Sequence, residues 1–534
     1  MKKIISCLLA CILLVAVFFV GCQKEDNKVQ YDGTEIALSD NEITVDGEKI
    51  TNDNTQAVYS ANDIVFYLAG QDFTYGEGEK EDEHSQAEAD AHTVVHITKP
   101  GRYVLSGEIS AGQVAVDLGE DAETDPEAVV TLILNNVDIT CTVAPAIIFY
   151  NVYECGVADE ESATKDVDTS KAGANVIIAD GTENNIHGSY VAKIYKSYEL
   201  NEDGTEVVDS KKLHKYDGAF YSKKSMNIDG GDKGNGALNI YAENEGLDSE
   251  LHLTINGGII NIASGNDGIN TNEDNVSVTT INGGSINILC NGTTGEGDGI
   301  DSNGWLVING GTVNCQACAT SGDAGIDSDL GIYINGGKVI ASGNMLDRIA
   351  GGEQTYAVFS FATRQSGVNT YELKDSDGKI VGECAPTNAF TYLLVAGDEL
   401  VSGEYSLFKN GKVVSVARMS QGGQMQRPGN MEIPEDMTFP EGITPPDNMG
   451  ERPEMPEGME NMTPPENMGG RPQKPDDTGE RPGMPEGVEP PEGMMGGKGP
   501  MNGVQNIENF STTFKIKKGE NQFFVASKEN VQAK

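Results

Sequence analysis

The sequence predicts an all-β solenoid, and two observations carry this prediction. The first is the tetrapeptide INGG, whose copies begin 26, 27 and 26 residues apart, at 255–258, 281–284, 308–311 and 334–337. The second is a Gly-Ile/Leu-Asp/Asn-Ser/Thr motif that occurs once in each period, at 246–249, 268–271, 299–302 and 325–328. A fixed period of this size indicates stacked structural units rather than one globular core.

The period selects the kind of solenoid. About 26 residues without helical periodicity are too few for a propeller blade of about 40 residues, and they fit one turn of a right-handed parallel β-helix. Equivalent positions should then stack about 4.8 Å apart. Three apolar ladders are predicted: Ile255, Ile281, Ile308 and Ile334; Ile260, Ile286, Val313 and Val339; Leu247, Ile269, Ile300 and Ile326. The asparagines of INGG should form an amide ladder at the corners: Asn256, Asn282, Asn309 and Asn335.

Composition divides the chain into five segments. Residues 421–504 hold 16 of its 20 prolines and 12 of its 16 methionines, and such a stretch predicts a disordered Pro/Met/Gly-rich insertion. Short Val/Ile-rich runs before it predict strands, interrupted by two polar loops at 152–174 and 190–216. The expected segments are a signal peptide at 1–22, a tether with N-terminal strands and an acidic loop at 23–90, the β-helix at 91–420, the insertion at 421–504 and C-terminal strands at 505–534.

The N-terminus reads as a targeting segment. Lys2 and Lys3 precede an apolar run, and FVGC at 19–22 is similar to a bacterial lipobox, in which the cysteine is lipidated. We therefore expect Cys22 to carry a lipid that holds the protein on the extracellular face of the cytoplasmic membrane. An uncleaved membrane anchor and a secreted protein are the alternatives.

Charge restricts the partners. The formal net charge is −46, so nucleic acid and anionic lipid headgroups would be repelled. Divalent cations, cationic polymers and anionic polymers bridged by cations remain compatible with this charge. The residues between Lys233 and Lys338 include neither lysine nor arginine.

The acidic residues around the Gly-Ile motif are the candidate metal ligands. Like charges a few ångströms apart repel, and calcium relieves this repulsion with six to eight oxygen ligands in flexible geometry. The candidates are Asp248, Asp267, Asn270, Asp298, Asp301, Asp323 and Asp327. Two ligand sets follow from the stacking, Asp267 with Asn270 and Asp301, and Asp298 with Asp301 and Asp327. The alternative is that these residues are solvent-facing corners.

The run GAFYSKKSMNIDGGDKGNGALNIYAENEGLDSELHLTINGG at 218–258, the repeated motifs and the upstream lipobox resemble a known family. This is the family of carbohydrate-binding β-helix lipoproteins of Gram-positive bacteria, related in fold to calcium-dependent pectate lyases. The resemblance implies a right-handed β-helix that holds calcium ions and binds cellulose-like or pectin-like polysaccharide.

Three functions are compatible with these observations. A non-catalytic binder would use calcium to bridge protein carboxylates to an acidic polysaccharide, with cellulose supported by the resemblance alone. A calcium-dependent lyase would also need a basic residue to take a proton, and the array has no lysine or arginine, so we expect no catalytic residue. A structural surface rod without a carbohydrate ligand is the third possibility.

Overall fold

The computed structural model describes residues 31–156, 158–366, 369–419 and 509–526. This part of the chain is nearly all β-structure, as predicted. Its helical elements are one four-residue helix, α2 (Gln86–Ala89), and two short 3-10 turns, η1 (Lys80–Asp82) and η2 (Glu120–Thr124). No helix in these residues is long and apolar enough to cross a membrane.

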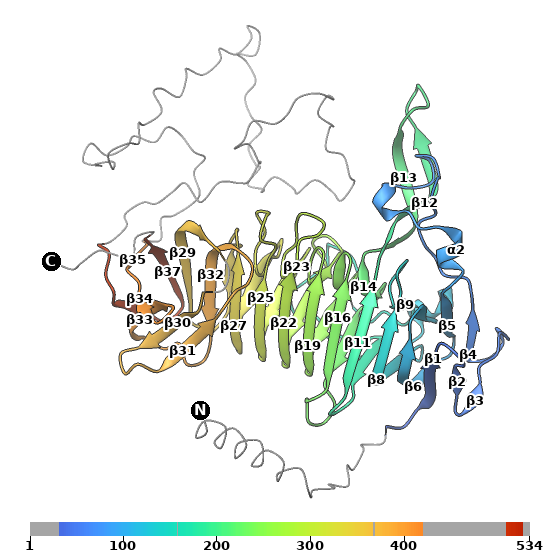
Figure 1. The fold of residues 1–534 in the computed structure, drawn as a ribbon, viewed down its shortest axis with the longest axis horizontal. Helices are drawn as coiled ribbons and strands as arrows, with labels where there is room; N and C mark the ends of the chain where they lie inside the picture. The colour runs from blue at the N-terminus through green and yellow to red at the C-terminus, as the bar shows by residue number, and fades with distance from the viewer. Residues whose placement is uncertain (1–30, 157, 367–368, 420–508, 527–534) are drawn as a thin grey trace, which may run out of the picture. The chain divides into compact units, whose positions relative to one another are not determined.

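Three columns of parallel strands form most of the structure (Figure 1). The first column is β5 (Thr93–Ile97), β7 (Gly112–Asp117), β9 (Ile147–Asn151), β14 (Gly218–Ser222), β17 (Glu245–Ser249), β20 (Ile269–Thr271) and β23 (Ile300–Ser302). The second is β10 (Ala174–Ile178), β15 (Met226–Asp229), β18 (Leu253–Ile255), β21 (Val278–Ile281), β24 (Trp305–Ile308), β26 (Gly331–Ile334) and β28 (Ile349–Gly351). The third is β11 (Glu183–Gly188), β16 (Ala237–Ala242), β19 (Ile259–Ser264), β22 (Ser285–Cys290), β25 (Thr312–Gln316) and β27 (Lys338–Gly343).

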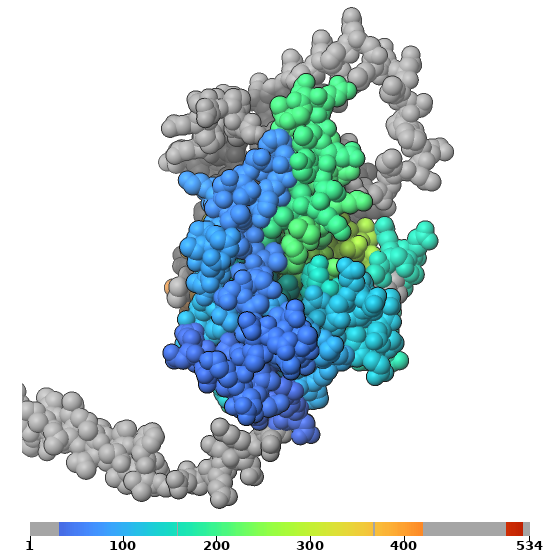
Figure 2. Space-filling model, turned by 90° about the vertical axis from the view of Figure 1, so that its right-hand side faces the viewer, coloured from blue at the N-terminus to red at the C-terminus, as the bar shows by residue number. Residues whose placement is uncertain are grey.

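We call one strand from each column, taken in chain order, a coil; β17, β18 and β19 form one. The first column belongs to an eight-stranded sheet, and the other two columns belong to a 22-stranded sheet. The long strand β8 (Val130–Thr140) pairs with both β10 and β11, and on its other side with β6 (Gly101–Ile109). The N-terminal strands are β1 (Thr34–Ser39), β2 (Thr44–Val45), β3 (Glu48–Lys49) and β4 (Val58–Ala61). Figure 2 shows the N-terminal end of the molecule.

The apolar ladders are confirmed. Ile260 pairs with Ile286, which pairs with Val313, and the INGG isoleucines pair in the same way through the second column. All twelve predicted ladder side chains are at most 3% exposed. Burying one such side chain stabilises the fold by about 1.5–3 kcal/mol, which offsets part of the entropy lost by the ordered chain. The ladders therefore form one continuous core between the columns.

The INGG corners also fold as predicted. Asn282 donates to Asn256 at 2.9 Å, and the same bond recurs from Asn309 to Asn282 and from Asn335 to Asn309. The last glycine of the motif requires a left-handed backbone, with φ of +89° at Gly284. A Cβ there would lie 2.8 Å from the carbonyl oxygen of Gly258 in the preceding coil. Glycine is thus needed both for the turn and for the close approach of the coils.

The segment 190–216 differs from the prediction of a loop. It forms an antiparallel hairpin of β12 (Val191–Leu200) and β13 (Val207–Tyr216), a two-stranded sheet of its own. The Asn201 side chain holds the turn by accepting from the backbone N–H of Thr205 at 2.9 Å. The outer part of the hairpin is exposed to solvent, whereas Val191, Ile194 and Tyr216 at its base are buried.

Antiparallel strands follow the last coil. β32 (Phe390–Ala396) pairs with β27 and with β29 (Tyr356–Gln365), so the pairing direction changes after the third column. A five-stranded sheet contains β30 (Tyr371–Asp375), β31 (Ile380–Cys384), β33 (Gly403–Lys409), β34 (Lys412–Val413) and β36 (Phe514–Ile516). β37 (Glu520–Val525) pairs in parallel with β29 and antiparallel with β35 (Val416–Arg418), and these elements share a second apolar core.

Several sequence-based expectations lie outside the described residues. They are the signal peptide, the lipidated Cys22 and the Pro/Met/Gly-rich insertion at 421–504. Strands β36 and β37 follow this insertion in the chain and pair with strands that precede it.

Candidate functional site

Two positions of each coil place oxygen-bearing side chains around the Gly-Ile motif. The residue before the glycine is acidic in four successive coils, at Asp217, Glu245, Asp267 and Asp298. The third residue of the motif forms the other set, in which Asp248 pairs with Asn270 and Asn270 pairs with Asp301. Asp327 continues this set, because its backbone N–H donates to the carbonyl of Ile300 in the preceding coil. Parallel pairing in register thus stacks oxygen donors on neighbouring coils.

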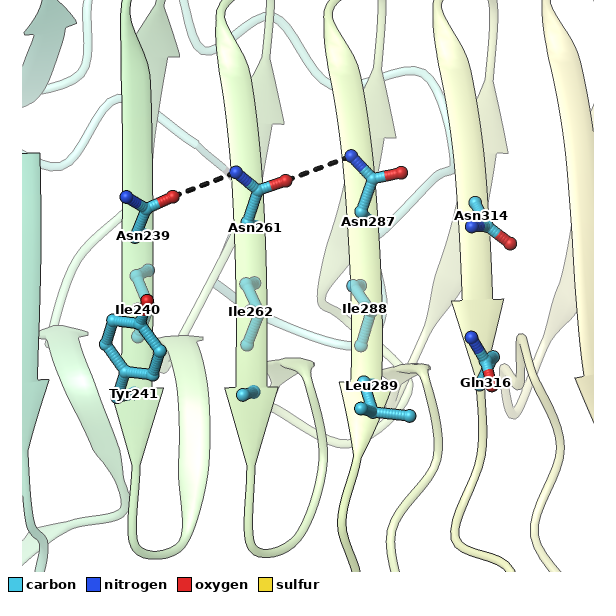
Figure 3. Close-up of a pocket in the computed structure, with 11 residues that line it drawn as sticks. Asn239, Ile240, Tyr241, Asn261, Ile262, Asn287, Ile288, Leu289, Asn314 and Gln316 are labelled. Carbon is cyan, nitrogen blue, oxygen red and sulfur yellow. Dashed lines mark hydrogen bonds between the residues drawn. The ribbon is translucent and has the colours of Figure 1, made fainter. Parts of the chain in front are cut away.

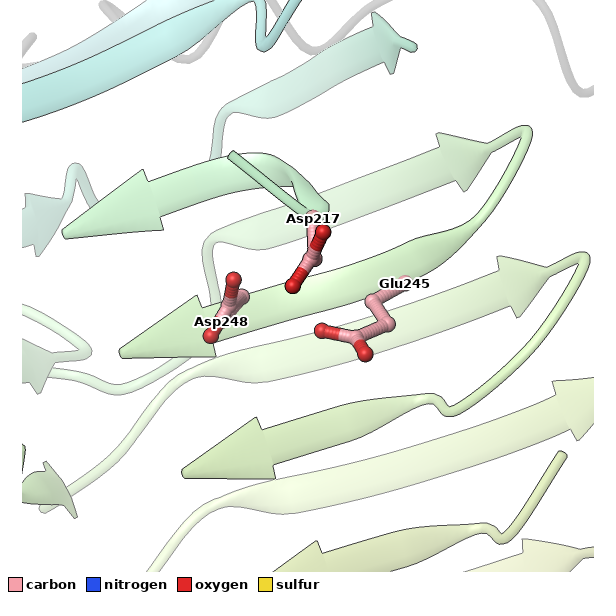
Figure 4. A group of neighbouring side chains, drawn as sticks. All are labelled: Asp217, Glu245 and Asp248. Carbon is pink, nitrogen blue, oxygen red and sulfur yellow. The ribbon is translucent and has the colours of Figure 1, made fainter. Parts of the chain in front are cut away.

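Three carboxylates converge in what we call group one: Asp217, Glu245 and Asp248. One oxygen of each lies within 4.8 Å of the others, and Figure 4 shows the three side chains turned toward a common space. Glu245 and Asp248 are 4% and 0% exposed. Isolated charges this deep in a protein are costly unless they are paired, protonated or bound to a cation.

The hydrogen bonds of group one leave some of its oxygen atoms without a partner. Asn270 Nδ2 donates to Glu245 Oε1 at 2.9 Å, and Asn272 Nδ2 donates to Asp248 Oδ1 at 2.7 Å. Three buried oxygens make no hydrogen bond: Glu245 Oε2, Asp248 Oδ2 and Asn270 Oδ1. Buried polar atoms usually have a partner, and an orphaned set of acceptors on two adjacent coils is the environment that a cation satisfies.

Group two consists of Asp298, Asp301 and Asp327, again with one oxygen of each within 4.8 Å of the others. All three are at most 7% exposed. Asp298 Oδ1 accepts from the backbone N–H of Ala324 at 2.5 Å. The structure therefore brings together one of the two ligand sets that the sequence suggested.

The remaining predicted ligands lie between or beside the two groups. Asp267 is buried, and its Oδ1 accepts from the backbone N–H of Asp298 at 2.6 Å. Asn270 is bonded to Glu245, so its amide lies against group one. Asp323 is half-buried, and its Oδ2 accepts from the backbone N–H of Gly297 at 2.6 Å and from the Ser321 hydroxyl. Asp323 thus organises a loop, whereas Ala324 occupies the position before the glycine of that coil.

Burial and mutual repulsion shift the titration of these carboxyls. Burial, and then the charge of Asp248, raises the pKa of Glu245 well above its ordinary value. Burial, and then the charge of Asp217, raises the pKa of Asp248 in the same way. The pKa of Asp298 is also raised by burial and by its acidic neighbours, of which Asp327 contributes most. Without a cation, the folded chain therefore favours protons on these groups.

Sequence reasoning missed Asp217 and Glu245. Both stand directly before a Gly-initiated strand of the first column, as Asp267 and Asp298 do, and the motif GLDS at 246–249 is preceded by glutamate. The signal was an acidic residue of either type at that position. It was overlooked because only aspartates before Gly-Ile were compared.

The hairpin β12–β13 supplies the basic residues that the array lacks. Lys215 Nζ lies 3.0 Å from Asp217 Oδ2, and Lys212 Nζ lies 3.1 Å from both carboxylate oxygens of Glu250. The Tyr221 hydroxyl donates to Glu250 Oε1 at 2.6 Å. The array itself has no lysine or arginine, as the sequence shows, but the hairpin brings two lysines to group one in space.

The donor sets of both groups consist of oxygen atoms, from carboxylates and one amide. Hard divalent cations prefer such donors, while softer transition metals prefer nitrogen and sulfur. The three orphaned oxygens at group one fit a cation that takes several oxygens at once. Chemically, the arrangement can hold cations and present a positive centre inside an acidic surface.

Comparisons with known proteins found a solved structure and a family model. A solved structure, the polysaccharide lyase-like protein from C. thermocellum in its gadolinium derivative, aligns with 20% identity and a TM-score of 0.30, covering 60% of this chain and 99% of that chain. No curated protein matches. The family model of the carbohydrate-binding domain-containing protein matches residues 91–357, which include all three columns and both carboxylate groups. Because this match spans half of the 534 residues, the chain belongs to the carbohydrate-binding domain-containing family.

Proposed function

We propose that the protein binds an acidic polysaccharide non-catalytically and that calcium at groups one and two is required. The observation that carries the proposal is the set of orphaned oxygens on Glu245, Asp248 and Asn270. Family membership supports a carbohydrate partner, and the buried carboxylates support a cation.

Calcium suits these residues better than magnesium. Calcium takes six to eight oxygens at flexible angles, whereas magnesium demands a near-ideal octahedron and retains several waters. In group one the ligands would be the carboxylates of Asp217, Glu245 and Asp248 with the amide oxygen of Asn270. In group two they would be the three aspartates. Bound calcium would neutralise carboxylates that otherwise repel one another and an approaching anion.

Acidic sugars suit the charge of the region once cations are bound. A uronate carboxylate is attracted to calcium and to the ammonium groups of Lys212 and Lys215 beside group one. Individual contacts of this kind are weak, and a polymer multiplies them along successive coils. Binding should therefore depend on chain length as well as on calcium.

Lyase activity is the second candidate, favoured by the position of Lys215 next to Asp217. A lyase needs a cation to bind the uronate carboxylate and a base to remove the proton at C5. To act as that base, Lys215 would first have to lose its proton, which the neighbouring carboxylate of Asp217 disfavours. A rise in ultraviolet absorbance from an unsaturated product would establish the activity. A structural rod without a carbohydrate ligand would show neither binding nor product.

The decisive experiment is a pull-down of the full chain on polygalacturonate, in calcium and in EGTA. Retention in calcium that is lost in EGTA is expected. Asp301→Asn should raise the calcium concentration that retention requires, because it removes one carboxylate of group two. Asp232→Asn, at an exposed position, should leave that concentration unchanged. Absence of retention in both conditions overturns the proposal.

The finer architecture and the cellular location belong to the same proposal. In-register pairing of successive coils supports a right-handed parallel β-helix. A lipid on Cys22 would anchor the protein at the extracellular face of the cytoplasmic membrane, where it meets external polysaccharide. Cys22→Ser should release the protein from the membrane fraction, and unchanged fractionation would exclude this anchor.

A further inference from the structure

A second column of asparagines runs along the strands of the third column. Asn261 Nδ2 donates to Asn239 Oδ1 at 2.8 Å, and Asn287 Nδ2 donates to Asn261 Oδ1 at 3.0 Å (Figure 3). Asn239 in turn donates to Asn185 Oδ1 at 2.9 Å, and Asn314 continues the column in register. Four of these asparagines line a groove with a volume of about 210 Å³: Asn239, Asn261, Asn287 and Asn314.

The amide column keeps hydrogen-bonding capacity for a ligand. An asparagine amide has two N–H donors and an oxygen with two lone pairs. Within the column, Asn261 uses one N–H and accepts one bond, so one N–H and one lone pair remain. The groove thus offers donors and acceptors in alternation, which match the hydroxyl groups of a sugar.

An exposed aromatic ring stands beside this column. Tyr241 is 46% exposed and stacks on His187, with ring centroids 4.5 Å apart and planes 12° from parallel. The two residues are register partners on β16 and β11. Ala263 and Leu289 continue the row from Tyr241 along the groove. A supported tyrosine ring next to short apolar side chains is a platform for the apolar face of a sugar ring.

The groove is electrically neutral. None of the eleven described residues that line it carries a charge, although the chain has a net charge of −46. A polyanion therefore meets no cation among the lining residues. One carboxylate contacts the column from β11, where Glu183 Oε1 accepts from Asn239 Nδ2 at 3.4 Å. Neighbouring amides lie one strand apart, at the strand spacing of about 4.8 Å. One residue of an extended β-1,4-linked glycan advances by nearly that length.

We propose that this groove binds an extended neutral β-linked polysaccharide that lies along the amide column, without a metal ion. Tyr241 stacks on a sugar ring, and Asn261 and Asn287 bond to its hydroxyls. The site shares no residue with groups one and two, so it is independent of the proposed calcium-dependent function.

The test is a depletion assay of the full chain on amorphous cellulose in EGTA, with polygalacturonate in calcium as a parallel arm. Wild type should be retained on cellulose in EGTA, and Tyr241→Ala should weaken that retention about tenfold. Tyr198→Ala is the matched control, since Tyr198 is 44% exposed on β12, away from the lining residues of the groove. Asn261→Asp, which keeps the shape and introduces a charge, should weaken retention as well.

Three results would overturn the proposal: no retention of wild type on cellulose, retention that EGTA abolishes, or equal retention of wild type and Tyr241→Ala. The second result would assign cellulose binding to the carboxylate groups. If wild type is retained on cellulose but not on polygalacturonate, the proposal for this groove stands and only the calcium-dependent function is contradicted. Melting temperatures of the variants establish that each is folded.

Discussion

Lys215 Nζ lies 3.0 Å from Asp217 Oδ2, so an insertion places an ammonium group against one of the three converging carboxylates of group one. Both side chains are largely buried, at 23% and 11% exposure. The lysine neutralises one carboxylate, while Glu245 and Asp248 each keep an oxygen without a hydrogen bond. Lys215 therefore offsets part of the negative charge of group one, and a bound cation would offset the rest.

Replacing this lysine should raise the dependence of the protein on calcium. Lys215→Gln removes the ammonium group, and we expect the free energy of unfolding in EGTA to fall by about 1 kcal/mol, the upper range for an ion pair near the surface. In saturating calcium the loss should be smaller, because the cation supplies the missing charge. Denaturant unfolding in both conditions measures the difference, and Lys211→Gln on the exposed side of β13 is the control. Equal losses of unfolding free energy in EGTA and in calcium would contradict the idea that the cation can replace the charge of Lys215.

Calcium should raise the melting temperature, and group two should account for part of this effect. A ligand present at about 100 times its dissociation constant stabilises by about 2.7 kcal/mol for each site. Asp301→Asn replaces one carboxylate of group two, so the calcium concentration at half-maximal stabilisation should rise. Asp232→Asn, at an exposed position, should leave the titration unchanged. A melting temperature that is the same in EGTA and in calcium would remove the cation from the proposal.

The stability of the chelated protein should decrease as pH rises. Burial raises the pKa values of Glu245 and Asp248 above their ordinary values of 4.5 and 3.8, so the folded state retains protons that the unfolded state has released. Stability from these groups is present below the ordinary values, and above them it falls by about 1.4 kcal/mol per pH unit for each such proton, up to the raised pKa.

Calcium must displace those protons, so its stabilising effect should grow over the same range of pH. Melting curves from about pH 5 to about pH 8, in EGTA and in calcium, test both statements. The difference between the two curves isolates the carboxylate groups from other titrating residues. A calcium effect that is constant over this range would show that the carboxyls are already ionised in the folded state.

The ladders could be predicted and parts of the site could not, for a physical reason. Ile286 and its equivalents recur at a fixed period, and parallel pairing turns a sequence period directly into a stack. Lys215 reaches group one through a hairpin whose length has no relation to the period. Asn261 was overlooked because a lone asparagine between isoleucines reads as the solvent face of a strand. Its significance appears only when the neighbouring coils place amides in hydrogen-bonding distance.

The core and the corner ladder should differ in their importance for stability. Ile286 is fully buried between Ile260 and Val313, so Ile286→Ala should lower the free energy of unfolding by about 2–5 kcal/mol through lost burial and a cavity. Asn282 is exposed at the corner, and Asn282→Ala removes hydrogen bonds that water replaces, at a net cost of about 1 kcal/mol.

Because each coil contacts mainly its two neighbours, Ile286→Ala should open the central coils before the antiparallel strands that follow them. Hydrogen exchange measures this order, and loss of protection at the same rate in β22 and β32 would show that the chain unfolds as one unit.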